Sequence, residues 1–145
     1  MSKNRAYPER PFVGVGVVVL RGDEVLLIQR GQAPNKGQWS IPGGKQRLGE
    51  TVMEAVHREL LEETGVIIEQ PALLDVVDFI VPDENAKIQF HYTVVDYQAK
   101  WLAGECRSGG DADAVKWFTF EEVNLLGLLE ITKKVILKAF RNSAT

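Results

Sequence analysis

The chain has 145 residues, 45% hydrophobic and 26% charged, which is enough to bury a core without disulfides or structural metals. Its formal net charge of −3 argues against a nucleic-acid-binding protein, because such domains usually carry a basic stripe. Cys106 is the only cysteine, which excludes an internal disulfide and a cysteine-rich zinc site and is typical of a reducing compartment. We therefore expect a single cytoplasmic domain over residues 1–145.

The first eleven residues (MSKNRAYPERP) are polar and contain two prolines. They lack the apolar core of a signal peptide, and no run in the chain approaches the roughly 18 apolar residues of a membrane span. We therefore expect no membrane partner.

Two apolar, β-branched runs follow, at residues 12–20 and 24–30. The short segment Arg21-Gly22-Asp23 between them predicts a β-hairpin with two buried strands. The next segment, residues 31–44, contains Pro34, Gly37 and Pro42 and is expected to be a loop, with residues 39–41 as a very short strand.

A helix is expected from Val52 to about Thr64. Thr51 and Glu54 form the S/T-x-x-E pattern of a capping box, and Gly65 is a typical helix C-cap. Both ends of this helix are therefore well defined by the sequence.

The second half of the chain predicts more strands and then helices. Residues 73–81 and 87–102 are expected to be long strands around the turn 82–85, and residues 114–118 a shorter one. Thr119 and Glu122 form a second capping box, and residues 128–141 have the spacing of an amphipathic helix. Together these elements predict an α/β fold, an α/β/α sandwich with a mixed β-sheet.

Three acids crowd the end of the predicted helix 52–64. At about 100° per residue, Glu62 and Glu63 lie on the same face as Glu59, together with Ala55 and Val56. Like charges at this spacing destabilise a helix by roughly 0.2–0.5 kcal/mol per pair, and the negative end of the helix dipole adds to the cost. A solvated acidic cluster is one interpretation, but the apolar neighbours favour an inward face that binds a cation.

Carboxylate oxygens at this density suit a hard divalent ion, Mg2+ or Mn2+, better than zinc. Arg58 stands four residues before Glu62 and is placed to form an ion pair that fixes its rotamer; an ordinary surface pair is the alternative. Gly43-Gly44 allows the backbone to approach a metal or an anion closely, although a tight turn explains these glycines equally well.

The spacing of these residues resembles the Nudix box over residues 44–66. Gly44, Glu50, the run Arg58-Glu59-Leu60, the pair Glu62-Glu63 and the pair Gly65-Val66 occupy its defining positions. The order of the expected elements over residues 11–141 is similar to that of a small MutT-type domain. The resemblance implies a Nudix fold and the hydrolysis of a nucleoside diphosphate linked to another moiety.

The resemblance also implies roles for individual residues. Glu59, Glu62, Glu63 and the carbonyl of Gly43 are expected to bind Mg2+, with Mn2+ as a substitute. Glu59 is in addition the candidate general base, and Arg58 is expected to orient a glutamate. Glu50 is expected to support the loop, although a glutamate near a helix N-terminus is also favoured by the dipole alone.

Outside the box the sequence offers further candidates. Asp111, in the loop 104–113, is the first choice for an additional catalytic acid, with an ordinary polar loop as the alternative. Arg30 and Lys45 are placed to bind phosphates, or else only to aid solubility. Trp39 is placed to stack on a base or to pack the loop.

The expected partner is a small-molecule nucleotide, bound by a monomer or a homodimer. Pro82 lies sixteen residues after Val66, which resembles the marker of ADP-ribose pyrophosphatases, although proline also suits a turn. We therefore expect ADP-ribose or a related nucleotide sugar as substrate. The alternatives are a (d)NTP pyrophosphohydrolase of the MutT type, whose length the chain matches better, and a non-catalytic nucleotide-sensing Nudix domain.

Overall fold

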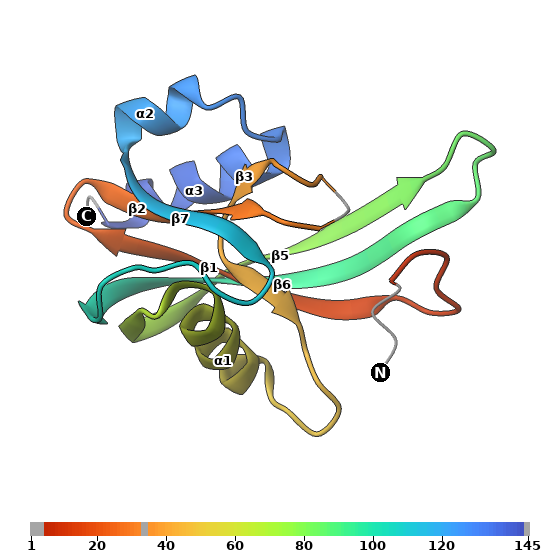
Figure 1. Ribbon diagram of the computed structural model, residues 1–145, viewed down its shortest axis with the longest axis horizontal. Helices are drawn as coiled ribbons and strands as arrows, with labels where there is room; N and C mark the ends of the chain where they lie inside the picture. Colours follow the sequence, from red (N-terminus) through yellow and green to blue (C-terminus); the bar gives the residue numbers. More distant parts are fainter. Residues whose placement is uncertain (1–4, 33–34, 144–145) are drawn as a thin grey trace.

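The computed structural model describes residues 5–32 and 35–143 (Figure 1). Its elements in chain order are β1 (Phe12–Arg21), β2 (Glu24–Arg30), β3 (Trp39–Ser40), β4 (Gly43–Lys45), α1 (Val52–Thr64), β5 (Ile67–Pro82), β6 (Ile88–Ala103), β7 (Ala112–Thr119), α2 (Phe120–Leu125) and α3 (Glu130–Ser143). Residues 33–34, inside the expected loop 31–44, lie outside the described residues. None of the helices in the described segments is long and apolar enough to cross a membrane.

The strands form one mixed sheet with the order β3-β2-β1-β6-β5, in which β4 also pairs with β1 and β7 with β2. The central pair β1 and β6 is parallel, and the other pairs are antiparallel. Helix α1 covers one face of the sheet, and α2 and α3 lie on the other (Figure 1). The predicted α/β/α sandwich with a mixed sheet is confirmed.

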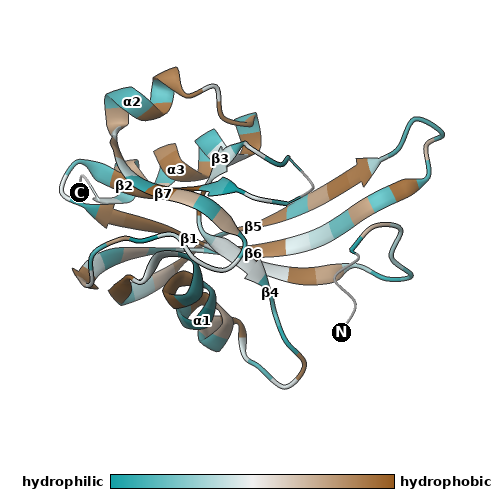
Figure 2. Ribbon diagram, in the orientation of Figure 1, coloured by the Kyte–Doolittle hydropathy of each residue, from teal (hydrophilic) through white to brown (hydrophobic). Residues whose placement is uncertain are grey.

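The hydrophobic core has two parts, one on each face of the sheet. Because side chains alternate along a strand, Val17 and Val19 of β1 pack with Ala55 and Leu60 of α1, whereas Val18 packs towards α3. Figure 2 shows that β1 and β2 are hydrophobic along much of their length, as strands buried on both faces must be.

The expected hairpin of β1 and β2 is present only at its turn. The two strands pair at Leu20 with Val25 and at Arg21 with Glu24, and then diverge. Beyond that point β1 pairs with β4, and β2 with β3 and β7. This separation, which the sequence did not predict, is where the cavity described below opens.

Two element boundaries differ from the sequence-based expectation. Strand β5 begins at Ile67 and not at Leu73, because it continues through an irregularity at Gln70, which has a φ of 52°. Residues 43–45 form strand β4, where a loop was expected. Pro82 ends β5, and the turn is closed after it by the Asp83 N–H, which donates to the Lys87 carbonyl at 2.7 Å.

Candidate active site

Helix α1 presents the acids, and its ends are held as the sequence predicts. Thr51 and Glu54 form the capping box, and Gly65 adopts the left-handed conformation with a φ of 73°. The loop after β6 covers the C-terminal end, where the Arg107 N–H donates to the Thr64 carbonyl at 2.9 Å. The end of the helix that carries the acids is therefore fixed against the rest of the domain.

The three acids of α1 differ in their surroundings. Glu63 is buried, with 5% of its surface exposed, and Glu59 is half-buried. Glu62 lies at the rim, with 45% of its side chain exposed. The acid face therefore points inward at Glu59 and Glu63, as expected, while Glu62 remains in contact with solvent.

Burial makes the two inner carboxylates hard to ionise. Burial raises the pKa of Glu63 to about 8, with the neighbouring Glu59 adding to the effect, although the Gly43 N–H donates to Glu63 Oε1 at 2.8 Å. Burial also raises the pKa of Glu59, against the opposing hydrogen bond from Arg58. Two such groups next to each other favour the binding of a cation or of protons.

Arg58 connects the box helix to the loop before it. Its Nε and Nη2 donate to Glu50 at 2.6 and 2.8 Å, and its Nη1 donates to Glu59 Oε1 at 2.6 Å. The expected pair with Glu62 is present, but at 3.5 Å. Glu50 is therefore the main partner of Arg58, whose hydrogen bonds lower the pKa of Glu50 to about 2.

The two glycines before the box make room for the acids and for the sheet. A methyl group added at Gly44 would overlap the carboxylate of Glu59, and one added at Gly43 would overlap the carbonyl oxygen of Val15. Neither glycine has a positive φ. They are thus required for the close approach of Glu59 and of the β1 backbone, and not for a turn with positive φ. The approach of a metal or an anion to these glycines stays a prediction.

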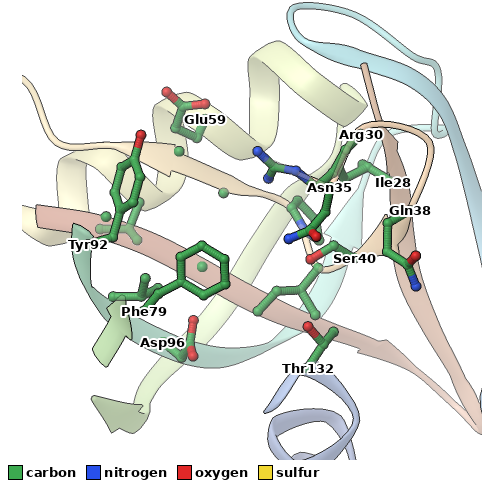
Figure 3. A pocket seen from close by; sticks show the side chains of 18 of the residues that line it. Ile28, Arg30, Asn35, Gln38, Ser40, Glu59, Phe79, Tyr92, Asp96 and Thr132 are labelled. Atoms are coloured by element: carbon green, nitrogen blue, oxygen red, sulfur yellow. The ribbon is translucent and has the colours of Figure 1, made fainter. Parts of the chain in front are cut away.

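A cavity opens between the diverging strands β1 and β2, under the loop that follows β2 (Figure 3). At one end its wall is polar and includes Glu59 and Glu63. Elsewhere the wall is mostly apolar, with residues from β3, β5, β6 and α3. The apolar part includes Trp39, Ile41, Val77, Phe79, Val94 and Val135.

Arg30 and Asp111, two of the residues singled out in the sequence, also line the cavity. Burial lowers the pKa of the Arg30 guanidinium, while Glu63 and Asp111 act against that effect. Asp111 is held by Gln32, whose Nε2 donates to Asp111 Oδ1 at 3.0 Å, and its carbonyl accepts from the Gly31 N–H at 3.0 Å. One basic and one acidic residue, both chosen from their sequence positions alone, therefore lie near Glu63.

The other two candidates have apolar contacts. Trp39 packs edge-to-face on Phe118, with ring centroids 5.0 Å apart, and also lines the cavity. Packing, one of its two expected roles, is thus present. Lys45 places its Nζ 4.3 Å from the ring centroid of Phe12 and is not among the residues that line the cavity.

The family model of the NUDIX domain matches residues 10–140. The chain belongs to the Nudix family. It is therefore one of the Nudix hydrolases, which act on phosphorus-containing anhydrides and depend on divalent metal ions.

Similar proteins include two curated Nudix relatives and one solved structure. The ADP-ribose pyrophosphatase of Methanocaldococcus jannaschii is 34% identical over 97% of this chain and 78% of its own length. The putative 8-oxo-dGTP diphosphatase 2 of Mycobacterium tuberculosis is 35% identical over 76% of this chain and 74% of its own. The NUDIX domain of Shewanella oneidensis NrtR, solved with ADP ribose, is 25% identical with a TM-score of 0.77, covering 94% of this chain and 90% of that one.

The side chains of this Nudix chain fit a hard divalent ion. The inner carboxylates of Glu59 and Glu63 offer oxygen ligands at the polar end of the cavity, and Glu62 lies one helical turn from Glu59 at the rim. Among the described residues, however, no three acidic, histidine or cysteine side chains already converge as a metal cage.

Two residues that the sequence analysis missed also line the cavity of this Nudix domain: Tyr92 and Asp96, both on β6. Asp96 is 4% exposed. Within residues 5–32 and 35–143, neither Asp96 Oδ1 nor the buried Tyr92 hydroxyl has a hydrogen-bonding partner. For Asp96 the available signal was a charged residue directly after the apolar pair Val94-Val95, in the middle of a predicted strand.

Proposed function

We propose that this Nudix hydrolase cleaves the pyrophosphate bond of ADP-ribose or of a related nucleotide sugar. The observation that carries the proposal is the cavity, whose acidic end at Glu59 and Glu63 continues into an apolar end. The acidic residues can hold the metal ions that a diphosphate requires, and the apolar wall suits a nucleoside. The relative named ADP-ribose pyrophosphatase, similar over 97% of the chain, supports this substrate.

Glu59, Glu62, Glu63 and the carbonyl of Gly43 would hold Mg2+ in this proposal, with Mn2+ as a substitute. When bound, such an ion supplies positive charge that polarises the phosphoryl oxygens and lowers the pKa of water. The raised pKa values of Glu59 and Glu63 describe carboxyls that gain from a nearby cation.

The chain's own residues supply position and proton transfer. Arg58 holds Glu59 by the 2.6 Å hydrogen bond, so that the carboxylate keeps one orientation while it accepts the proton of the attacking water. Arg30, at the cavity wall, offers a guanidinium for the negative phosphates. Asp111, whose carbonyl accepts from the Gly31 N–H, is the candidate for an additional acid.

Trp39 and Lys45 have weaker support as substrate-binding residues. Trp39 has one edge against Phe118 and contributes to the cavity wall, so it offers apolar surface to a nucleoside. Lys45 reaches a phosphate only if its ammonium leaves the ring of Phe12.

Two other functions have support of their own. The relative named putative 8-oxo-dGTP diphosphatase 2, at 35% identity, favours a (d)NTP pyrophosphohydrolase. The NUDIX domain of NrtR, solved with ADP ribose, is compatible with a domain that binds a nucleotide without cleaving it.

We further propose that the protein is cytoplasmic, on the basis of its single cysteine, and that it is a monomer or a homodimer with no nucleic-acid partner.

A hydrolysis screen tests the proposal. ADP-ribose, nucleotide sugars, dinucleoside polyphosphates, 8-oxo-dGTP and the common (d)NTPs are compared by kcat/KM in Mg2+. The highest value is expected for ADP-ribose, with AMP and ribose 5-phosphate as products. A higher value for 8-oxo-dGTP would select the (d)NTP function, and tight binding of ADP-ribose without any product would select the sensing function.

A further inference from the structure

The side chain of Asp96 is buried at the base of the cavity. Asp96 lies in the middle of β6, opposite Gly16 of the parallel strand β1, and only 4% of it is exposed. A methyl group at Gly16 would overlap Asp96 Oδ1 and come within 2.9 Å of Ile41 Cδ1. The absence of a side chain at position 16 therefore leaves the space that the carboxyl group occupies.

Among the described residues, no cation acts to lower the pKa of this carboxyl group. Its Oδ1 accepts no hydrogen bond, and the charge that acts on it is a like charge, Asp75 on β5. Burial in the first place, and Asp75 in the second, raise the pKa of Asp96 to about 7. A buried acceptor without a donor destabilises a fold, so a group that remains in such a place generally has a function outside folding.

The surroundings of Asp96 indicate what fills the space next to it. Figure 3 shows Asp96 on the other side of the cavity from Glu59, so the carboxyl group lies away from the acidic end. Ile41, Val77 and Val135 line the same cavity. A planar, largely apolar ring with an N–H group on its edge matches these walls and this acceptor better than a sugar, whose hydroxyl groups need several polar partners.

A second cation site is a poor match for the same position. Asp75 is the acid whose charge acts on Asp96, but it does not line the cavity. Its Oδ2 lies 3.7 Å from Lys138 Nζ. One carboxyl group among apolar side chains does not supply the several oxygen ligands that a hard cation requires.

We propose that the carboxyl group of Asp96 accepts a hydrogen bond from the amino group of a purine base, and thereby determines which nucleotides the enzyme binds. The proposal deepens the proposed function, since it takes the cavity to be the nucleotide site. The purine is adenine or guanine, and the two use Asp96 differently. A protonated carboxyl group donates one hydrogen bond and accepts one, which matches the N6 amino group and N1 of adenine. An ionised carboxylate accepts two, which matches the N1–H and N2 amino groups of guanine.

Binding of nucleoside monophosphates in Mg2+, measured by titration calorimetry, tests this without any turnover. Two pairs differ by one amino group: AMP against purine riboside 5′-monophosphate, and GMP against IMP. We expect the unchanged protein to bind the amino-bearing member of one pair about tenfold or more tightly, because the other member leaves a buried acceptor unpaired.

Variants at Asp96 identify the group responsible. Asp96→Leu keeps the branched arrangement of heavy atoms without polar atoms and is expected to reduce that preference to less than about threefold. Asp96→Asn, which both donates and accepts, is expected to retain a preference for AMP but to lose one for GMP. Asp78→Leu, at an exposed position on the neighbouring strand and outside the cavity wall, is the matched control and is expected to keep the preference.

Two results would overturn the proposal: equal binding within both pairs by the unchanged protein, or a preference that survives in Asp96→Leu. The first of these needs no variant to fold. The proposed function can fail separately: a clear amino-group preference without hydrolysis of any substrate would leave the role of Asp96 standing. Hydrolysis without such a preference would leave the proposed function standing and rule out this role of Asp96.

Discussion

Arg58 donates hydrogen bonds to both carboxylate oxygens of Glu50, at 2.6 and 2.8 Å, and the same guanidinium donates to Glu59. Glu50 belongs to the loop before α1, so this contact joins the loop to the candidate catalytic helix. Bidentate geometry of this kind fixes a guanidinium in two directions, which a lysine ammonium cannot reproduce. The position of Glu59 therefore depends on a residue that does not line the cavity.

Arg58→Lys tests this dependence. We expect kcat to fall by roughly 10- to 100-fold, the usual effect of removing a residue that orients a metal ligand, while the protein remains folded. Steady-state kinetics with ADP-ribose in Mg2+ measure the effect. Arg47→Lys is the control, because Arg47 contacts Glu62 at the exposed rim, at 3.7 Å. A similar loss in both variants would mean that the bidentate contact between Arg58 and Glu50 is not the cause of the loss.

Gly44→Ala should displace the carboxylate of Glu59, because the added methyl group would occupy the same space. We expect a loss of at least about tenfold in kcat, since small displacements of a catalytic group are costly. Gly14→Ala, whose methyl group would have ordinary contacts at 3.5 Å, should have a smaller effect. Equal activity of Gly44→Ala and the unchanged enzyme would show that Glu59 need not lie there.

Asp96 should make stability depend on pH. Its pKa is about 7 in the folded protein against 3.8 for the free group, so the folded state binds the proton more tightly than the unfolded state. Stability must therefore fall as the pH rises from about 4 to 7, by about 1.4 kcal/mol per unit of pKa difference at most. Urea unfolding at pH 5 and pH 8 measures it: the variant Asp96→Asn should gain stability relative to the unchanged protein at the higher pH. If the difference in free energy of unfolding between the two proteins were the same at pH 5 and pH 8, the raised pKa of Asp96 would be wrong.

Mg2+ should stabilise the folded protein through Glu59 and Glu63. A ligand at 100 times its dissociation constant adds about 2.7 kcal/mol to the free energy of unfolding. Thermal melting with Mg2+ and with a chelator measures the shift, which should shrink strongly in Glu63→Gln. Glu69→Gln, an exposed glutamate on β5, is the control of equal charge change. If the shift is as large in Glu63→Gln as in that control, the site assignment is wrong.

Features that depend on short stretches of sequence were predictable. The limits of α1 follow from Thr51 and Gly65, and the start of α2 follows from Thr119, because capping is decided by residues within one turn. The acids of the box helix were found for the same reason: their spacing alone places them on one face.

Features that depend on distant strands were not predictable. Strand β4 has glycine at two of its three positions and exists because β1 pairs with it. Asp96 is buried because Gly16, eighty residues earlier in the chain, stands opposite it in the parallel pair of β1 and β6. Helical spacing correctly placed Glu62 on the same face as Glu59 and Glu63, but the rest of the domain covers only Glu59 and Glu63, and Glu62 stays exposed.

The most direct test of the account is the rate of AMP formation from ADP-ribose in Mg2+, measured for the unchanged enzyme, Glu59→Gln and the control Glu69→Gln. Glutamine keeps the size of Glu59 but cannot accept the proton or offer a charged ligand, so kcat should fall by about 100-fold or more. The control should retain its rate. Unchanged turnover in Glu59→Gln, or no AMP from the unchanged enzyme, would contradict the account.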